Sequence, residues 1–169
     1  MPSGTVTELW LLRHGESVAN VAAARATAAG ADHMQVEYRD ADVPLTKLGE
    51  RQSEALGREL ARQNVSGLPV TFWTSPYVGA RRTISIALGA ADVRSPNEHV
   101  DERLRDNEMG ILEQLTPAGF ENLRPTEYAR RLRLGPYYHR PPGGESFTDV
   151  LLRFRSVMTD VDRVEDQNG

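Results

Sequence analysis

Short apolar runs and segments of helical periodicity alternate along this chain. Leu9–Leu12 is a continuous apolar run, which is typical of a buried strand. Gly15 ends it, and the alanine-rich stretch Ser17–Ala24 predicts a helix, because alanine is the best helix former. The β-branched and aromatic run Val70–Thr74 predicts a second strand, and Glu98–Asp101 a short third one.

Two further helices are expected around the second strand. Thr46 is a good N-cap for a helix over Lys47–Arg62. Ser75-Pro76 fits an N-cap followed by a first helical residue, and that helix should run to Gly89. The apolar stripe of the earlier helix would consist of Leu48, Ala55, Leu56 and Leu60.

The strongest helical periodicity comes last. Ser146, with Asp149 three residues on, resembles a capping box. The core-facing residues of this helix would be Phe147, Val150, Leu151, Phe154, Val157, Met158 and Val161. Before it, residues 111–142 mix prolines and glycines with short helical patches and the basic cluster Arg130–Arg133, so we expect an inserted lid there.

Strands separated by helices predict a three-layer α/β/α sandwich with a mainly parallel sheet. The 169 residues would form a single domain, 1–169, with the lid at 111–142. Ligands in such folds bind beyond the carboxyl ends of the strands. Candidate chemistry should therefore be sought at Arg13–Glu16 and at Thr74–Pro76.

The end of the sequence suggests that more strands follow. The last helix needs a sheet to bury its apolar stripe, yet only two clear strands and one weak strand precede it. The polar run Val164–Gly169 ends in Asn-Gly, which is turn chemistry. We therefore expect that one or more C-terminal strands are missing and that this is the N-terminal part of a longer domain.

Composition narrows the function classes. A net charge of −4 gives no indication of a nucleic-acid or membrane surface, and neither partner is expected. The absence of cysteine removes disulfides, thiolate metal sites and cysteine nucleophiles. No pair of histidines has the spacing of a helical metal site, so no metal or cofactor is expected. Without a leader-like N-terminus or a long apolar run, a cytoplasmic location is expected.

The first junction has the chemistry of an oxyanion site. The helix start after Gly15 offers free N–H groups and the positive end of a dipole. Arg13 adds a planar cation that matches phosphate oxygens, and a neutral His14 imidazole can attack phosphorus. The alternative is that His14 caps the strand while Arg13 makes a surface ion pair.

Five segments extend this interpretation. They are Arg13-His14-Gly15-Glu16-Ser17 with Asn20, Leu45–Gln52, Thr74-Ser75-Pro76 with Ala80 and Thr83, Leu104–Gly110, and Gly143–Ser146. In this order they resemble the signature segments of the histidine phosphatase (phosphoglycerate mutase-like) superfamily, with a lid segment more similar to its phosphatase branch. Asp40-Ala41-Asp42-Val43 mimics a motif of haloacid-dehalogenase-type phosphatases, but no apolar strand precedes it.

The resemblance implies a metal-independent phosphomonoester hydrolase with a phosphohistidine intermediate on His14. Arg13 would hold phosphoryl oxygens, and Asp106, or else Glu108, would protonate the leaving alcohol. The substrate would be a small phosphorylated molecule or a phosphoprotein. The expected substrate-binding residues are Gly15, Glu16, Asn20, Arg82 and Arg140.

Two departures from the family pattern leave alternatives open. The second arginine of the family falls on Gly79, and Arg82, on the same helix face, is the expected substitute. The second histidine of the family, on a strand after the long helix, has no match in this chain. The alternatives are a phosphoglycerate mutase-type phosphotransferase and a catalytically silent module that binds phosphorylated ligands.

Overall fold

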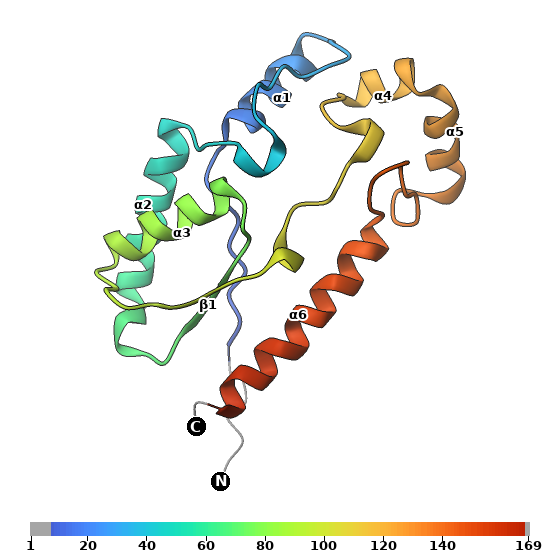
Figure 1. Cartoon of the computed structure of the whole chain (residues 1–169). Helices are drawn as coiled ribbons and strands as arrows, with labels where there is room; N and C mark the ends of the chain where they lie inside the picture. The colour runs from blue at the N-terminus through green and yellow to red at the C-terminus, as the bar shows by residue number, and fades with distance from the viewer. Residues whose placement is uncertain (1–7, 168–169) are drawn as a thin grey trace.

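The computed structural model describes residues 8–167, and helices dominate them. Figure 1 shows their arrangement around a small sheet. The elements are α1 (Val18–Ala28), α2 (Lys47–Arg62), β1 (Thr71–Thr74), α3 (Val78–Ala90), β2 (Asn97–Val100), α4 (Pro117–Leu123), α5 (Pro125–Leu134) and α6 (Phe147–Gln167), with 3₁₀ turns η1 (Asp40–Asp42), η2 (Val65–Gly67), η3 (Glu102–Leu104) and η4 (Gly110–Leu112).

The sheet is a parallel pair, which confirms the α/β class expected from the sequence. Thr71 of β1 lies opposite Asn97 of β2, and Thr74 lies opposite Val100. Because the strands are parallel, both carboxyl ends lie at one edge of the sheet. The segments that follow them, from Ser75 and from Asp101, therefore start side by side.

Local capping signals set most helix starts as the sequence predicts. The Ser17 hydroxyl accepts from the Asn20 N–H at 3.2 Å, and the Thr46 hydroxyl accepts from the Gly49 N–H at 3.1 Å. One expectation is wrong: α3 begins at Val78 after an extended Tyr77, two residues later than predicted. The Ser75 hydroxyl accepts from the Tyr77 N–H and so shapes the turn rather than the helix.

The buried face of α2 also differs from the expected stripe. Leu48 and Ala55 are exposed, whereas Ser53, Gly57 and Leu60 are buried. A Cβ placed on Gly57 would lie 2.3 Å from the Ala87 carbonyl oxygen of α3. The small residues let the two helix backbones approach closely. The core beside them contains Leu60, Val65, Ala87 and Ala91, with Leu56, Val70, Phe72 and Val93 packed against it.

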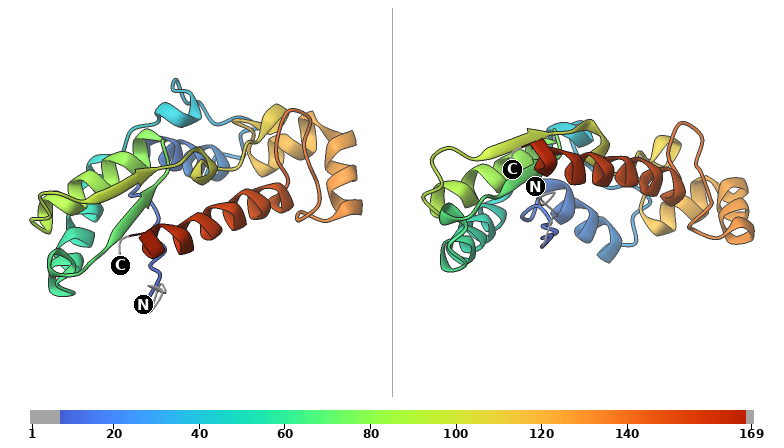
Figure 2. Two further views of the ribbon diagram at one scale, coloured as in Figure 1. Left: turned by 60° about the horizontal axis from the view of Figure 1, so that its bottom comes forward. Right: turned by 90° about the horizontal axis from the view of Figure 1, so that it is seen from below.

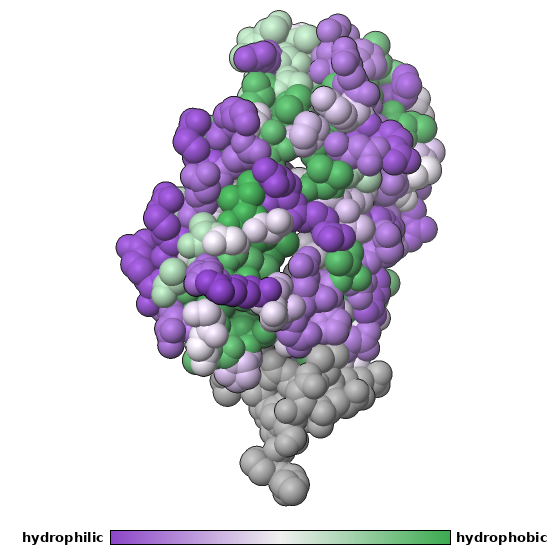
Figure 3. All heavy atoms as spheres, turned by 60° about the vertical axis from the view of Figure 1, so that its left-hand side comes forward, coloured by the Kyte–Doolittle hydropathy of each residue, from purple (hydrophilic) through white to green (hydrophobic). Residues whose placement is uncertain are grey.

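The expected strand at Leu9–Leu12 does not form among the residues that the structure describes. The segment is neither helix nor strand, and Leu11 is 75% exposed. An apolar run becomes a strand only when a neighbouring backbone supplies its hydrogen bonds, and no strand of the described chain pairs with it. Patches of apolar residues are visible between hydrophilic ones on the face shown in Figure 3.

The apolar stripe of α6 is only partly core. Val157 and Val161 are buried, but Phe147 and Leu151 are exposed beside a hollow of about 510 Å³. This corrects the expectation that the whole stripe is core. The polar residues 164–167, expected to lead into a turn, belong to α6, and the expected Asn-Gly turn at 168–169 and the further strands lie outside the described residues.

The segment expected to be a lid contains α4 and α5, which lie at the far end of the molecule from α2 and α3 (Figure 2). His139 is buried there, and its Nε2 lies 3.1 Å from Glu127 Oε2, so the loop after α5 is tied back to that helix. The bounds of the lid stay a prediction. Across the described residues, no helix has the length and apolar character needed to span a membrane.

We predict opposite effects for two helix glycines. Gly57→Ala should destabilise the fold by about 1–3 kcal/mol, because its methyl group overlaps the α3 backbone. Gly89→Ala, on α3 where a Cβ meets open space, should stabilise it by roughly 0.5–1 kcal/mol. Urea unfolding of both variants measures the difference, and equal effects would mean that α2 and α3 do not pack as described.

Candidate active site

The loop Arg13–Glu16 is held by a backbone contact with the start of α2. A Cβ on Gly15 would lie 2.4 Å from the Gly49 carbonyl oxygen, and a Cβ on Gly49 would lie 2.1 Å from the Glu16 carbonyl oxygen. Real Cβ atoms do not come so close, so only glycine fits at either position. The Gly residues of two separate sequence motifs thus meet each other.

Thr83 fixes the same loop from the side of α3. Its hydroxyl accepts from the Gly15 N–H at 3.0 Å and donates to the Gly79 carbonyl oxygen at 2.8 Å. Thr83 is buried, so this bond is shielded from water. The loop is therefore clamped between α2 and α3, at the carboxyl end of β1.

The clamped loop sets the chemistry of His14. Its Nδ1 lies 2.7 Å from the carbonyl oxygen of Gly15. A carbonyl oxygen can only accept, so Nδ1 carries the proton and donates it. In the neutral ring, Nε2 then has the free lone pair. Chemically, the Nε2 atom of this half-buried imidazole can therefore act as a nucleophile or a base.

The other residues expected in this loop lie in two kinds of environment. Arg13 is exposed and has no hydrogen-bond or ion-pair partner within residues 8–167, which leaves its guanidinium available to an anion. Glu16 is engaged structurally, because its carboxylate accepts from the Thr46 hydroxyl at 2.6 Å. Asn20 uses its side-chain oxygen to cap α1 through the Ser17 N–H at 3.0 Å.

Gly79 faces His14 across the site. A Cβ on Gly79 would lie 3.9 Å from His14 Nδ1, in ordinary contact. Position 79 therefore adjoins His14, and a Cβ fits there without a clash. Arg82 forms an ion pair with Glu50 of α2 at 3.4 Å and is largely exposed. Its expected role in substrate binding stays a prediction.

A group of carboxylates lies near His14. The pKa of Asp40, in η1, is raised by desolvation and by the negative charges of Asp106, Glu113 and Glu108, while His14 opposes the shift. The pKa of Tyr77 is also raised, first by burial and then by Asp40, Glu108 and Asp106. Asp40 thus interacts electrostatically both with His14 and with Asp106 and Glu108. No sequence signal assigned it to this site.

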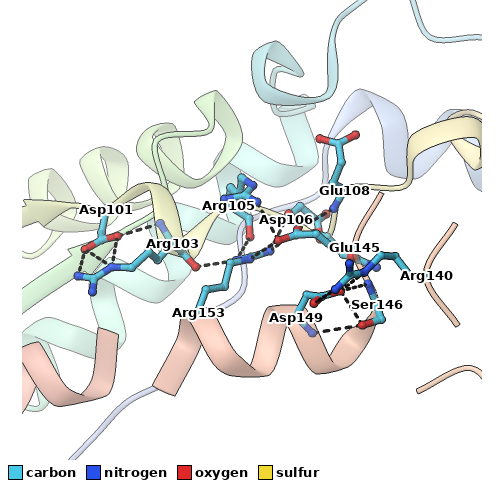
Figure 4. Close-up of polar contacts among 11 residues, drawn as sticks. Asp101, Arg103, Arg105, Asp106, Glu108, Arg140, Glu145, Ser146, Asp149 and Arg153 are labelled. Carbon is cyan, nitrogen blue, oxygen red and sulfur yellow. Dashed lines mark hydrogen bonds and ion pairs between the residues drawn. The ribbon is translucent and has the colours of Figure 1, made fainter. Parts of the chain in front are cut away.

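Arg140 lies elsewhere, at the start of α6. Its guanidinium binds both carboxylate oxygens of Asp149, as Figure 4 shows. Asp149 also accepts from the N–H and hydroxyl of Ser146 at 2.8 and 2.7 Å. These bonds hold the pKa of Asp149 well below its usual value. In this arrangement Arg140 completes a helix cap, and its role in substrate binding stays a prediction.

Two residues that sequence reasoning missed hold the segment carrying Asp106 and Glu108. Arg153 and Glu145 bind the backbone of that segment from the side of α6 (Figure 4). Glu145 stands in the Gly-Glu-Ser segment, which was a detectable signal. Arg153 could not be detected from the sequence, because it looks like any polar residue of an amphipathic helix. Within the described chain, no group of three or more histidines and carboxylates could hold a metal ion.

The similarity to known proteins extends over nearly the whole chain. The model of the histidine phosphatase superfamily (branch 1) matches residues 9–169. Human 6-phosphofructo-2-kinase/fructose-2,6-bisphosphatase 3 is 29% identical over 157 residues, which is 93% of this chain but 26% of that protein. The chain thus spans about a quarter of the length of this curated relative.

Solved structures share the fold. A structure named mycobacterial hydrolase 1 gives a TM-score of 0.66 at 27% identity, covering 89% of this chain and 62% of that one. Mycobacterial glucosyl-3-phosphoglycerate phosphatase, in a structure with VO3, gives 0.64 at 25% identity, covering 91% and 64%. Since the family match runs through all the segments described above, this protein belongs to the histidine phosphatase superfamily, branch 1.

Proposed function

We propose that this chain is a phosphomonoester hydrolase that acts through a phosphohistidine on His14. The observation that carries the proposal is the hydrogen bond from Nδ1 to the Gly15 carbonyl oxygen, which leaves Nε2 as the free nucleophile. The Nε2 lone pair forms a bond to phosphorus, and the bond to the ester oxygen breaks. Water then cleaves the phosphorus–nitrogen bond and releases phosphate.

Arg13 stabilises the phosphoryl oxygens in this scheme. It adjoins His14 in the chain and has no competing partner in the described part of the structure. A guanidinium donates two parallel hydrogen bonds to a phosphoryl group and keeps its charge at every working pH. The proposed chemistry needs no metal ion, because cationic side chains supply the electrostatic stabilisation.

A carboxylic acid donates the proton that the leaving alcohol needs. Asp106 and Glu108 occupy the expected segment. Asp40 is a third candidate, because its raised pKa favours the protonated form that an acid catalyst requires. Asp40 interacts electrostatically with His14 and also with Asp106 and Glu108, which connects the three carboxyl groups.

The relatives support a phosphoryl substrate without identifying it. One structural neighbour is named as a phosphatase of glucosyl-3-phosphoglycerate, and its structure contains VO3. One curated relative is named as a fructose-2,6-bisphosphatase as well as a kinase. We therefore assign the substrate class as a phosphomonoester, carried by a small molecule or by a phosphoprotein.

A second candidate function is a phospho-ligand-binding module without turnover. The specific observation in its favour is Gly79, which leaves the position facing His14 without a side chain. Arg82 offers no direct replacement in this arrangement, because it pairs with Glu50. Such a protein would bind phosphate through Arg13 and release it unchanged.

The first prediction from this proposal concerns His14. Incubation with a reactive phosphodonor, followed by alkaline trapping and mass spectrometry, should place a phosphoryl group on His14. Arg13→Ala should reduce labelling by about 10-fold to 100-fold, the value of a charge-assisted hydrogen bond. His33→Ala, at an exposed histidine, is the control and should label normally. Label that survives His14→Ala would end the proposal.

The second prediction concerns Gly79. Gly79→Arg should tighten binding of inorganic phosphate by about 10-fold to 100-fold, because a guanidinium beside His14 adds a charge-assisted contact. Gly89→Arg adds the same charge to α3 at a position that faces open space, and should leave phosphate affinity unchanged. Calorimetric titration of both variants measures this. If the two variants bound inorganic phosphate with equal affinity, position 79 would not adjoin the bound phosphate.

The third prediction concerns two aspartates with opposite pKa shifts. The folded state raises the pKa of Asp40, so its ionisation costs stability above about pH 4, the ordinary value. The folded state lowers the pKa of Asp149, so its ionised form adds stability above that pH and loses it on acidification. Asp40→Asn should therefore raise the melting temperature at pH 7, and Asp149→Asn should lower it.

Both differences from the wild type should shrink as the pH falls through about 4, where the unfolded carboxyl groups also become protonated. Melting curves between pH 3 and pH 8 record this. If Asp40 is a proton donor, Asp40→Asn should also slow phosphoryl transfer while it stabilises the protein. Shifts of the same sign in both variants would contradict the described environments.

A further inference from the structure

The segment between η3 and η4 carries Asp106 and Glu108 without being helix or strand. Such a segment lacks a regular ladder of backbone hydrogen bonds. The groups that bind its backbone therefore decide where these two carboxylates lie. In this structure, those groups come from α6 and from the loop that leads into it.

Arg153 of α6 binds this backbone with its whole guanidinium group. Nη1 donates to the carbonyl oxygens of Arg103 and Arg105 at 2.6 and 2.8 Å, and Nη2 donates to that of Asp106 at 2.9 Å. Nε and Nη2 donate to Glu145 at 3.0 and 3.2 Å. A guanidinium has five N–H groups, and these five bonds use all of them.

Glu145 binds the same segment further along. Its Oε2 accepts from the Glu108 N–H at 3.2 Å, and its own N–H donates to the Glu108 carbonyl oxygen at 2.8 Å. Its Oε1 also accepts from the Arg105 side chain at 2.8 Å. Burial opposes ionisation of Glu145, but the hydrogen bonds from Arg153 and the Glu108 N–H outweigh it and lower its pKa.

The pair lies behind the segment, away from solvent. The side chains of Arg153 and Glu145 are only 12% and 15% exposed. In Figure 4, Arg153 reaches from α6 to the segment, while the carboxylate of Glu108 points away from that helix. Bonds to charged groups at such depth are stronger than exposed ones, because water does not screen them. The pair thus holds the backbone firmly and leaves the opposite side free.

We propose that Arg153 and Glu145 are positioning residues for the catalytic acid. They fix the backbone of residues 103–108, so that the carboxylic acid of Asp106 or Glu108 meets the leaving oxygen as the phosphoryl group passes to His14. This inference rests on the proposed function. The pair acts through the acid and does not contact substrate, so its loss should affect only reactions that need a proton.

The test compares two phosphate esters in single-turnover labelling of His14. The leaving group of 2,4-dinitrophenyl phosphate departs as a stable anion, whereas that of phenyl phosphate must take a proton as its bond to phosphorus breaks. Arg153→Lys keeps the charge but has one ammonium in place of the fork, so it cannot bind all five acceptors. It should slow labelling by phenyl phosphate about 10-fold to 100-fold, and labelling by the dinitrophenyl ester less than about 3-fold.

Matched variants separate positioning from a general loss of structure. Arg155→Lys makes the same change two residues along α6, where the side chain is exposed and without a partner in the described chain, and should label like the wild type. Glu145→Gln keeps the shape and loses the charge, and should reproduce the selective defect. If circular dichroism shows that Arg153→Lys does not fold, Glu145→Gln replaces it in the test.

A double-mutant cycle decides whether the pair acts through the acid. In a chain with Asp106→Asn and Glu108→Gln, the further change Arg153→Lys should not slow the labelling of His14 by phenyl phosphate any more. The positioning role would be overturned if Arg153→Lys slowed labelling by both esters equally. It would also be overturned if Arg153→Lys slowed phenyl phosphate labelling as much in the chain without Asp106 and Glu108 as in the wild type. A wild-type chain that neither ester labels would instead overturn the proposed function, and this inference with it.

Discussion

The backbone contact between Gly15 and Gly49 is the constraint on which the site depends. It brings the loop that carries His14 against the first turn of α2, at a distance that excludes any side chain. With that loop fixed, the Gly15 carbonyl oxygen can hold His14 Nδ1–H, and Thr83 can reach the Gly15 N–H from α3. The ring orientation of His14 is thus a consequence of the packing of these two glycines.

The other half of the site is built on a different principle. The loop at His14 is fixed by close steric contact, whereas the segment with Asp106 and Glu108 is fixed by charge-assisted hydrogen bonds from Arg153 and Glu145. Steric contact suits an imidazole that must keep one ring orientation. Hydrogen bonds to a backbone suit an irregular segment, which has no packing face of its own. The parallel strands bring the start of the second segment, after β2, beside the residues that lead from β1 into α3, the helix whose Thr83 binds the His14 loop.

Sequence alone predicted several helix starts and the family. Capping by Thr46 and the reciprocal bonds of Ser146 and Asp149 are local, so spacing of three residues was enough to predict them. The ordered motifs indicated the superfamily, and the match over residues 9–169 confirms it. The position of Gly79 was also predictable, because the family pattern over Thr74–Thr83 places its second arginine there.

Tertiary structure decided what depends on residues far apart in the chain. Leu9–Leu12 has the composition of a strand but forms none here, since a strand requires a partner that its own residues cannot supply. The guanidinium groups of Arg82 and Arg140 pair with carboxylates that only folding brings close, and their roles in substrate binding stay predictions. The hydrogen bonds from Arg153 to the carbonyl oxygens of Arg103 and Arg105 likewise form only when α6 packs against that segment. They could not be predicted, because contacts between residues far apart in the chain produce no periodic pattern in the sequence.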